Sequence, residues 1–123
     1  MYTLDTNVII YYIKEDAEVI RTVDKILTGG YAMYVSAISE VELFRFPQLE
    51  AVETEKIEAL LGTVSIIAVD SQIARSAANL GKMHGLDTAD SVIAATALFT
   101  GTTLLTRNVR DFKKAPNLRV ERA

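Results

Sequence analysis

The stretch Met1-Tyr-Thr-Leu-Asp-Thr-Asn-Val-Ile-Ile10 is the basis of the fold that we expect, because its first apolar residues end at an acid, Asp5. Residues 1–4 predict a short buried strand, and the apolar residues that follow Asn7 predict a helix. In an open parallel sheet, ligands bind in the crevice outside the carboxyl ends of the strands. Asp5 is therefore expected to point into such a crevice.

Five short runs rich in β-branched residues or tyrosine recur along the chain, and helix-like periodicity separates them. Strands that alternate with helices favour a parallel sheet covered on both faces. We expect an α/β fold, a three-layer α/β/α sandwich with a central, mainly parallel sheet. The predicted strands cover residues 1–4, 31–35, 64–69, 102–105 and 118–120.

Glycine and proline predict the ends of three helices. A helix over residues 17–27 should end at Gly29-Gly30, and one over residues 72–84 should end at Gly85. A third helix, starting near Ser39, should end before Pro47, because the residue that precedes a proline is pushed out of the helical region. With 123 residues, half of them apolar, the chain is expected to form a single domain over residues 1–123.

The composition limits the kinds of catalytic and metal-binding site that the chain can form. The chain has no cysteine, which excludes disulfides, zinc thiolate sites and thiol nucleophiles and suits a reducing cytosol. His84 is its only histidine, so a metal site would have to be rich in oxygen ligands, which favour Mg²⁺ or Mn²⁺ over Zn²⁺. No stretch approaches the roughly 18 apolar residues of a membrane span. We expect a soluble, cytoplasmic protein without a membrane partner.

The net charge of −3 hides an uneven distribution. Residues 1–100 carry 7 Lys or Arg against 14 Asp or Glu, whereas residues 101–123 carry 6 against 2. A basic end beside an acidic metal site could hold a phosphate backbone, although a solvated basic surface has the same pattern. The candidates for contact with an RNA backbone are Arg107, Arg110, Lys113 and Lys114.

Four acids follow predicted strands or lie near predicted helix starts: Asp5, Glu42, Asp90 and Asp111. Carboxylates gathered at one crevice would repel each other unless a divalent cation lay between them, so this pattern predicts a metal-dependent hydrolase. Polar residues near the acids, expected to support them or to order water, are Asn7, Ser39, Thr106 and Asn108.

Each acid also has a structural interpretation. Asp5 could cap a helix, and Ser39 with Glu42 has the spacing of a capping box. Asp90 could be a second cap beside Asp87, which resembles an N-cap residue. Both Asp87 and Asp90 are candidates for the third acid, and we choose Asp90 because it precedes the Ile93-Ala-Ala95 run. Asp111 could instead pair with a nearby arginine, namely Arg107 or Arg110.

Together these segments resemble the PIN domain family, and within it the VapC toxins of bacterial toxin-antitoxin systems. The resemblance covers nearly the whole chain. It implies a Mg²⁺- or Mn²⁺-dependent endoribonuclease in which Asp5, Glu42 and Asp90 are the core metal-binding acids and Asp111 is a fourth, more variable one. It also implies an RNA substrate, a cognate antitoxin and a homodimer. The segments that carry it are Leu4-Asp-Thr-Asn7, Ser36, Ser39-Glu-Val-Glu-Leu43, Asp90, Val92-Ile-Ala-Ala95, Leu105-Thr-Arg-Asn108 and Asp111-Phe112.

Two other classes of protein compete with this interpretation. A non-catalytic PIN-like module would bind RNA or a protein without cutting. A receiver-type signalling domain also gathers acids around Mg²⁺, but it needs paired acids after the first strand and a lysine near the last one. Here Thr6 and Asn7 follow Asp5, and no lysine ends the run at Leu105.

Overall fold

The computed structural model describes residues 1–123, the whole chain. A five-stranded sheet in the order β3-β2-β1-β4-β5 forms its centre, and every neighbouring pair of strands is parallel. This confirms the predicted α/β fold with a parallel sheet. The strands are β1 (Tyr2–Leu4), β2 (Met33–Ser36), β3 (Ser65–Ile67), β4 (Thr103–Thr106) and β5 (Val120–Arg122).

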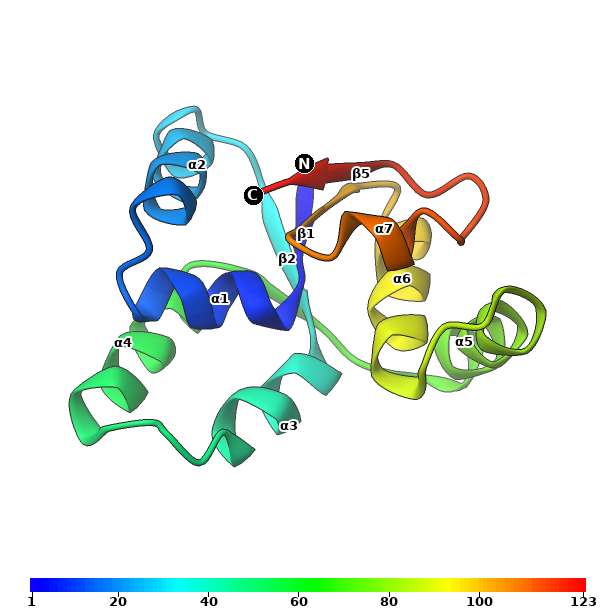
Figure 1. Cartoon of the computed structure of the whole chain (residues 1–123), viewed down its shortest axis with the longest axis horizontal. Coiled ribbons are helices and arrows are strands. Elements are labelled where there is room, and N and C mark those ends of the chain that lie inside the picture. The colour runs from blue at the N-terminus through cyan, green and yellow to red at the C-terminus, as the bar shows by residue number, and fades with distance from the viewer.

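Helices cover both faces of the sheet, as Figure 1 shows, with α1, α2 and α4 on one side and α5, α6 and α7 on the other. No helix is both long and apolar enough to cross a membrane. The helices are α1 (Thr6–Ile13), α2 (Ala17–Thr28), α3 (Ala37–Arg45), α4 (Ala51–Leu61), α5 (Ser71–His84), α6 (Thr88–Thr100) and α7 (Val109–Phe112).

The predicted helix ends are close to those observed. Gly85 ends α5 in the left-handed conformation, with φ of 74°. Phe46, which precedes Pro47, is extended, so α3 stops at Arg45. The helix α3 begins at Ala37, two residues before the predicted start near Ser39, because Ser36 is its N-cap and accepts a hydrogen bond from the Ile38 amide. Ser39 therefore lies inside the helix.

Two apolar clusters hold the layers together. The larger one joins α1, α2 and α4 to the sheet and includes the fully buried Val8 and Val35. The second joins α6 and α7 to the other face, with Phe112 and Ile93 at its centre. Because α6 is apolar and rich in alanine, it packs close to the sheet and is buried from Ser91 to Ala97.

The order of the strands creates a switch point between β1 and β4. The chain leaves β1 toward β2 and β3 on one side, and β4 and β5 extend the sheet on the other. In such sheets the crevice outside the carboxyl ends of the strands is the preferred ligand site. Asp5 directly follows β1, and Thr106 is the last residue of β4. These two residues therefore border the crevice.

Candidate active site

Asp5 is only 3% exposed and lies where β1 turns into α1. It holds the N-cap position of α1, yet its side chain makes no capping hydrogen bond. Its Oδ2 instead accepts a hydrogen bond of 2.8 Å from Thr106 Oγ1. Capping therefore does not account for the position of this side chain, although the first-turn amides of Thr6 and Asn7 influence it. This carboxylate joins the ends of two neighbouring strands.

The environment of Asp5 disfavours its charge. The pKa of Asp5 is raised from 3.8 to about 6. Burial is the largest cause of the rise, and the negative charge of Glu42 adds to it, whereas the hydrogen bond from the Thr106 hydroxyl lowers the pKa. The backbone amides of Thr6 and Asn7 lower the pKa in part. A buried carboxylate in this state gains from a nearby cation.

Glu42 lies on α3 and faces α1. Its Oε1 accepts a hydrogen bond of 2.6 Å from Thr6 Oγ1, and the Thr6 hydroxyl also lies 2.7 Å from Ser39 Oγ. The capping-box interpretation of Ser39 and Glu42 is wrong, because Ser36 caps the helix and Ser39 is fully buried inside it. Ser39 instead contributes to the contact that holds Glu42.

Asp87 and Asp90 have different surroundings. Asp87 is exposed and caps α6 by accepting a hydrogen bond of 2.8 Å from the Asp90 amide. Asp90, in the first turn of α6, has a pKa raised from 3.8 to about 7. Burial is the largest cause, and the negative charges of Asp87, Asp5, Glu42 and Asp111 follow. The field of the other three candidate acids therefore reaches Asp90, which favours it over Asp87 as the third acid.

Asp111 lies on the short helix α7. Its Oδ2 accepts a hydrogen bond of 3.1 Å from Asn108 Nδ2, and its Oδ1 lies 3.7 Å from Lys114 Nζ. The predicted pairing of Asp111 with Arg107 or Arg110 is wrong. The carboxylate is 41% exposed and keeps access to solvent.

Arg107 points away from the acids. Its guanidinium donates to Asp16 Oδ1 at 2.8 Å and lies 4.9 Å from the centre of the Tyr11 ring. It also donates to the carbonyl oxygen of Ala123, the last residue. Because β4, α1 and β5 meet at this side chain, its main role in the structure is to hold these elements together.

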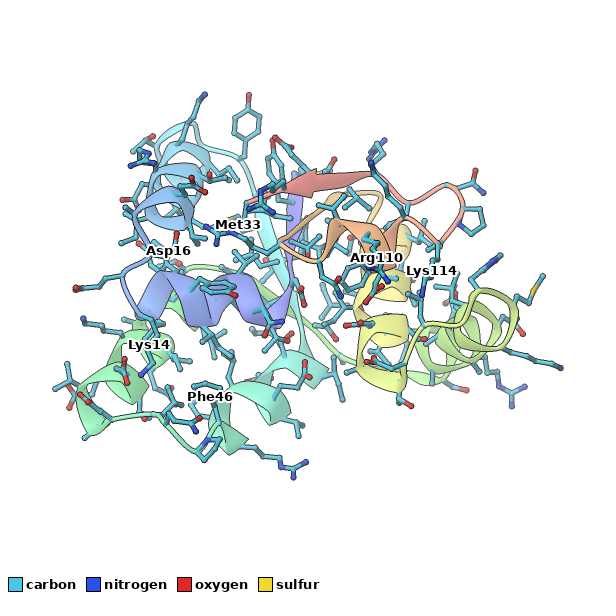
Figure 2. The ribbon with its side chains drawn as sticks, viewed as in Figure 1. Lys14, Asp16, Met33, Phe46, Arg110 and Lys114 are labelled. Atoms are coloured by element: carbon cyan, nitrogen blue, oxygen red, sulfur yellow. The ribbon has the colours of Figure 1, made fainter.

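The other basic residues near α7 are exposed. Figure 2 labels Arg110, on α7, and Lys114, which follows this helix. Lys114 pairs with Asp111, while Arg110 and Lys113 form no salt bridge. These three cations therefore lie close to Asp111 on the outside of the molecule.

The supporting polar residues fall into two groups. Thr106 and Ser39 are fully buried and form hydrogen bonds within the site, and Asn108 bonds to Asp111 and, through its amide, to Thr106. Asn7 is exposed in the first turn of α1. Sequence analysis missed Thr6, although it stands between Asp5 and Asn7. Its position in a strand-to-helix turn was a signal, but the sequence could not show which of these side chains points inward.

Three of the four candidate acids have no basic partner. None of the salt bridges in the structure involves Asp5, Glu42 or Asp90. At the same time, no three histidine, cysteine, aspartate or glutamate side chains are arranged to hold a metal ion directly. The donors are all carboxylate oxygens, the type that Mg²⁺ and Mn²⁺ prefer, and Mg²⁺ usually keeps several water ligands. The carboxylates are therefore suitable ligands for such an ion. They would bind it after their side chains rotate, or through water molecules that lie between them and the ion.

Comparison with known proteins shows the family of the chain. The model of the PIN domain family matches residues 2–118. The chain belongs to the PIN domain family. Within that family, it is 29% identical over 126 residues to Ribonuclease VapC19 of Mycobacterium tuberculosis, an alignment that covers 96% of this chain and 97% of that protein.

The structure of this PIN domain is also similar to solved structures. One is VapBC-1 from nontypeable Haemophilus influenzae, with a TM-score of 0.78 and 29% sequence identity over 98% of this chain and 96% of that chain. Another is DNA-bound VapBC from Salmonella typhimurium, with a TM-score of 0.80 and 26% identity over the same shares of the two chains.

Proposed function

We propose that this PIN domain is a Mg²⁺- or Mn²⁺-dependent endoribonuclease and the toxin of a VapBC-type toxin-antitoxin pair. The observation that carries the proposal is that Asp5 lies buried after β1, at the switch point of the sheet, and that the charges of Asp5 and Glu42 act on Asp90 while none of the three acids has a basic partner. The family match and the relative named as a ribonuclease support it.

The four candidate acids would have different roles toward the cation. Asp5, Glu42 and Asp90 would hold the cation, and Asp111, which is more exposed, would complete its surroundings. When bound, a divalent cation supplies charge that activates water and stabilises the phosphate during cleavage. The acids also need that charge before an RNA phosphate can approach, because the cation inverts the local potential.

The basic residues near α7 would hold the RNA backbone. Arg110, Lys113 and Lys114 are exposed close to Asp111, so they can contact phosphates that flank the scissile bond. Arg107, the fourth candidate, is held by Asp16 and Tyr11 and would act indirectly.

A cognate antitoxin is the proposed protein partner. The solved VapBC structures that this chain resembles support such a pairing. An apolar groove of about 420 Å³ between α1, α2 and α4 could take an apolar segment of the partner. Its apolar lining includes Ile13, Ile20, Leu27 and Leu60.

A homodimer is the proposed assembly. Val41 and Phe44 on α3 are 51% and 44% exposed, as large apolar side chains on one helix. Burial of such residues against a second copy is favourable. Light scattering of the purified protein tests this proposal: a dimeric mass that Phe44→Glu converts to a monomeric mass supports it, and a monomeric wild type contradicts it.

Cleavage of total cellular RNA tests the nuclease. We expect discrete cuts with Mg²⁺ or Mn²⁺ that EDTA abolishes. Glu42→Gln should abolish the cuts, whereas Glu40→Gln, on the same helix, should keep them. Equal cleavage by both variants would contradict the assigned site. RNA binding without cleavage by the wild type would favour the non-catalytic module.

A further inference from the structure

Two hydrogen-bonded relays with the same layout hold two of the candidate acids. In the first, the backbone amide of Asn108 donates to Thr106 Oγ1 at 2.8 Å, and the Thr106 hydroxyl donates to Asp5 Oδ2. In the second, Thr6 Oγ1 donates to Glu42 Oε1 and lies 2.7 Å from Ser39 Oγ. In each relay a threonine hydroxyl binds one oxygen of an acid.

The direction of the second relay follows from counting protons. A threonine hydroxyl has one proton to donate. The Thr6 proton is used for Glu42, because the Thr6 hydroxyl is the donor in that bond. The Ser39 hydroxyl must therefore donate to Thr6 Oγ1. This order, from Ser39 to Thr6 to Glu42, polarises the Thr6 hydroxyl and strengthens its bond to the carboxylate.

Thr6 differs from most other threonines in the helices of this protein. Thr22, Thr54 and Thr96 donate to backbone carbonyl oxygens four residues earlier in the chain. Thr6 is the first residue of α1, so no preceding turn offers it a carbonyl. Its hydroxyl reaches α3 instead, across 36 residues of sequence. The hydrogen bond from Thr6 therefore holds the side chain of Glu42 and does not stabilise the backbone of α1.

We propose that Thr6 is a positioning residue that holds Oε1 of Glu42 and leaves Oε2 free to face the cation. This inference rests on the proposed function. A glutamate side chain has several rotatable bonds, and fixing them before a ligand arrives removes an entropic cost of binding. Partners that orient the ligands of a metal typically change metal affinity or activity by about 10- to 100-fold.

Metal affinity is the first test. Melting temperatures would be recorded against Mn²⁺ concentration for the wild type, Thr6→Val and Thr6→Ser. We expect Thr6→Val, which keeps the shape and loses the hydroxyl, to need about tenfold more Mn²⁺ for half of the shift. Thr6→Ser should stay near the wild type. A Thr6→Val response equal to that of the wild type would overturn the inference.

Thr3 provides the matched control. It is fully buried in the middle of β1, and its hydroxyl also pairs with another hydroxyl, Thr102 Oγ1 at 2.6 Å, which precedes β4 and forms no hydrogen bond with the candidate acids. Thr3→Val should lower stability without changing the Mn²⁺ dependence. An equal change in both variants would assign Thr6 a structural role only. If Thr6→Val fails to fold, Ser39→Ala, which removes the donor to Thr6, should weaken the Mn²⁺ response in the same direction, and an unchanged response would overturn the inference.

A metal-free measurement separates this inference from the proposed function. A double-mutant cycle between Thr6→Val and Glu42→Ala, followed by urea denaturation in EDTA, reports the contact alone. We expect the losses of stability to be non-additive, and additive losses would overturn the positioning contact. If the contact is present but the wild type shows neither a Mn²⁺ response nor cleavage, the proposed metal-dependent function fails, and the role toward a cation fails with it.

Discussion

Replacing Asp5 with asparagine should stabilise the protein at neutral pH in metal-free buffer. Asp5 is 3% exposed, and its surroundings raise its pKa from 3.8 to about 6. Its ionised form is thus unfavourable in the folded state. Asparagine removes the charge and keeps an oxygen that can accept the hydrogen bond from Thr106. The substitution that is expected to end catalysis should therefore make the fold more stable.

The magnitude follows from linkage between protonation and folding. A raised pKa means that the folded state binds the proton more tightly than the unfolded state does. The contribution of Asp5 to stability therefore falls as pH rises from 3.8 to about 6, and the full penalty persists above that window. At about 1.4 kcal/mol per pKa unit, the penalty at pH 7.5 is about 3 kcal/mol. Asp90, with a pKa of about 7, should extend the pH-dependent range upward.

Urea denaturation in EDTA between pH 4.5 and pH 8 measures this effect as the difference between Asp5→Asn and the wild type. That difference cancels the titration of acids that do not interact with Asp5, among them Asp16 and Glu53, whose pKa values are lowered. It retains a smaller effect from Asp90, whose pKa the charge of Asp5 raises. Glu55→Gln is the control, because Glu55 is exposed and forms no salt bridge or side-chain hydrogen bond. A gain that does not depend on pH, or an Asp5→Asn protein less stable than the wild type at pH 7.5, would refute the reasoning.

Three further predictions concern the metal, the packing and the basic surface. Mn²⁺ at about 100 times its dissociation constant should stabilise the wild type by about 2.7 kcal/mol, and calorimetry that detects no stabilisation would contradict a metal site. Gly81→Ala should cost about 1 to 3 kcal/mol in urea denaturation, because its Cβ would lie 2.9 Å from Ser91 Oγ, and Ser91→Ala in the same chain should recover part of this. Arg107→Gln should lower the melting temperature, because Arg107 donates to Asp16. Arg110→Gln should leave the melting temperature unchanged and weaken RNA binding, most strongly at low salt. Thermal melts and filter binding that show a stable Arg107→Gln protein, or unchanged RNA binding by Arg110→Gln, would exclude these roles.

Local sequence patterns were enough to predict the layers of the fold. Apolar runs of a few residues, separated by helical periodicity, predicted all five strands within about three residues of their observed ends. They also predicted that Asp5 follows the first strand. Gly85 and Pro47 predicted helix ends because their effects on the backbone are local. These features depend on neighbours along the chain, which a sequence displays directly.

The partners of the site residues depended on contacts between distant parts of the chain. Asp5 and Thr106 are 101 residues apart, and Thr6 and Glu42 are 36 apart, yet each pair shares a hydrogen bond. Spacing alone suggested a local capping box for Glu42, and proximity in sequence suggested Arg107 or Arg110 as an alternative partner of Asp111. Parallel strands bring their carboxyl ends together whatever the length of the connection between them, so these contacts, and the burial that raises the pKa of Asp5, arise only when the sheet forms.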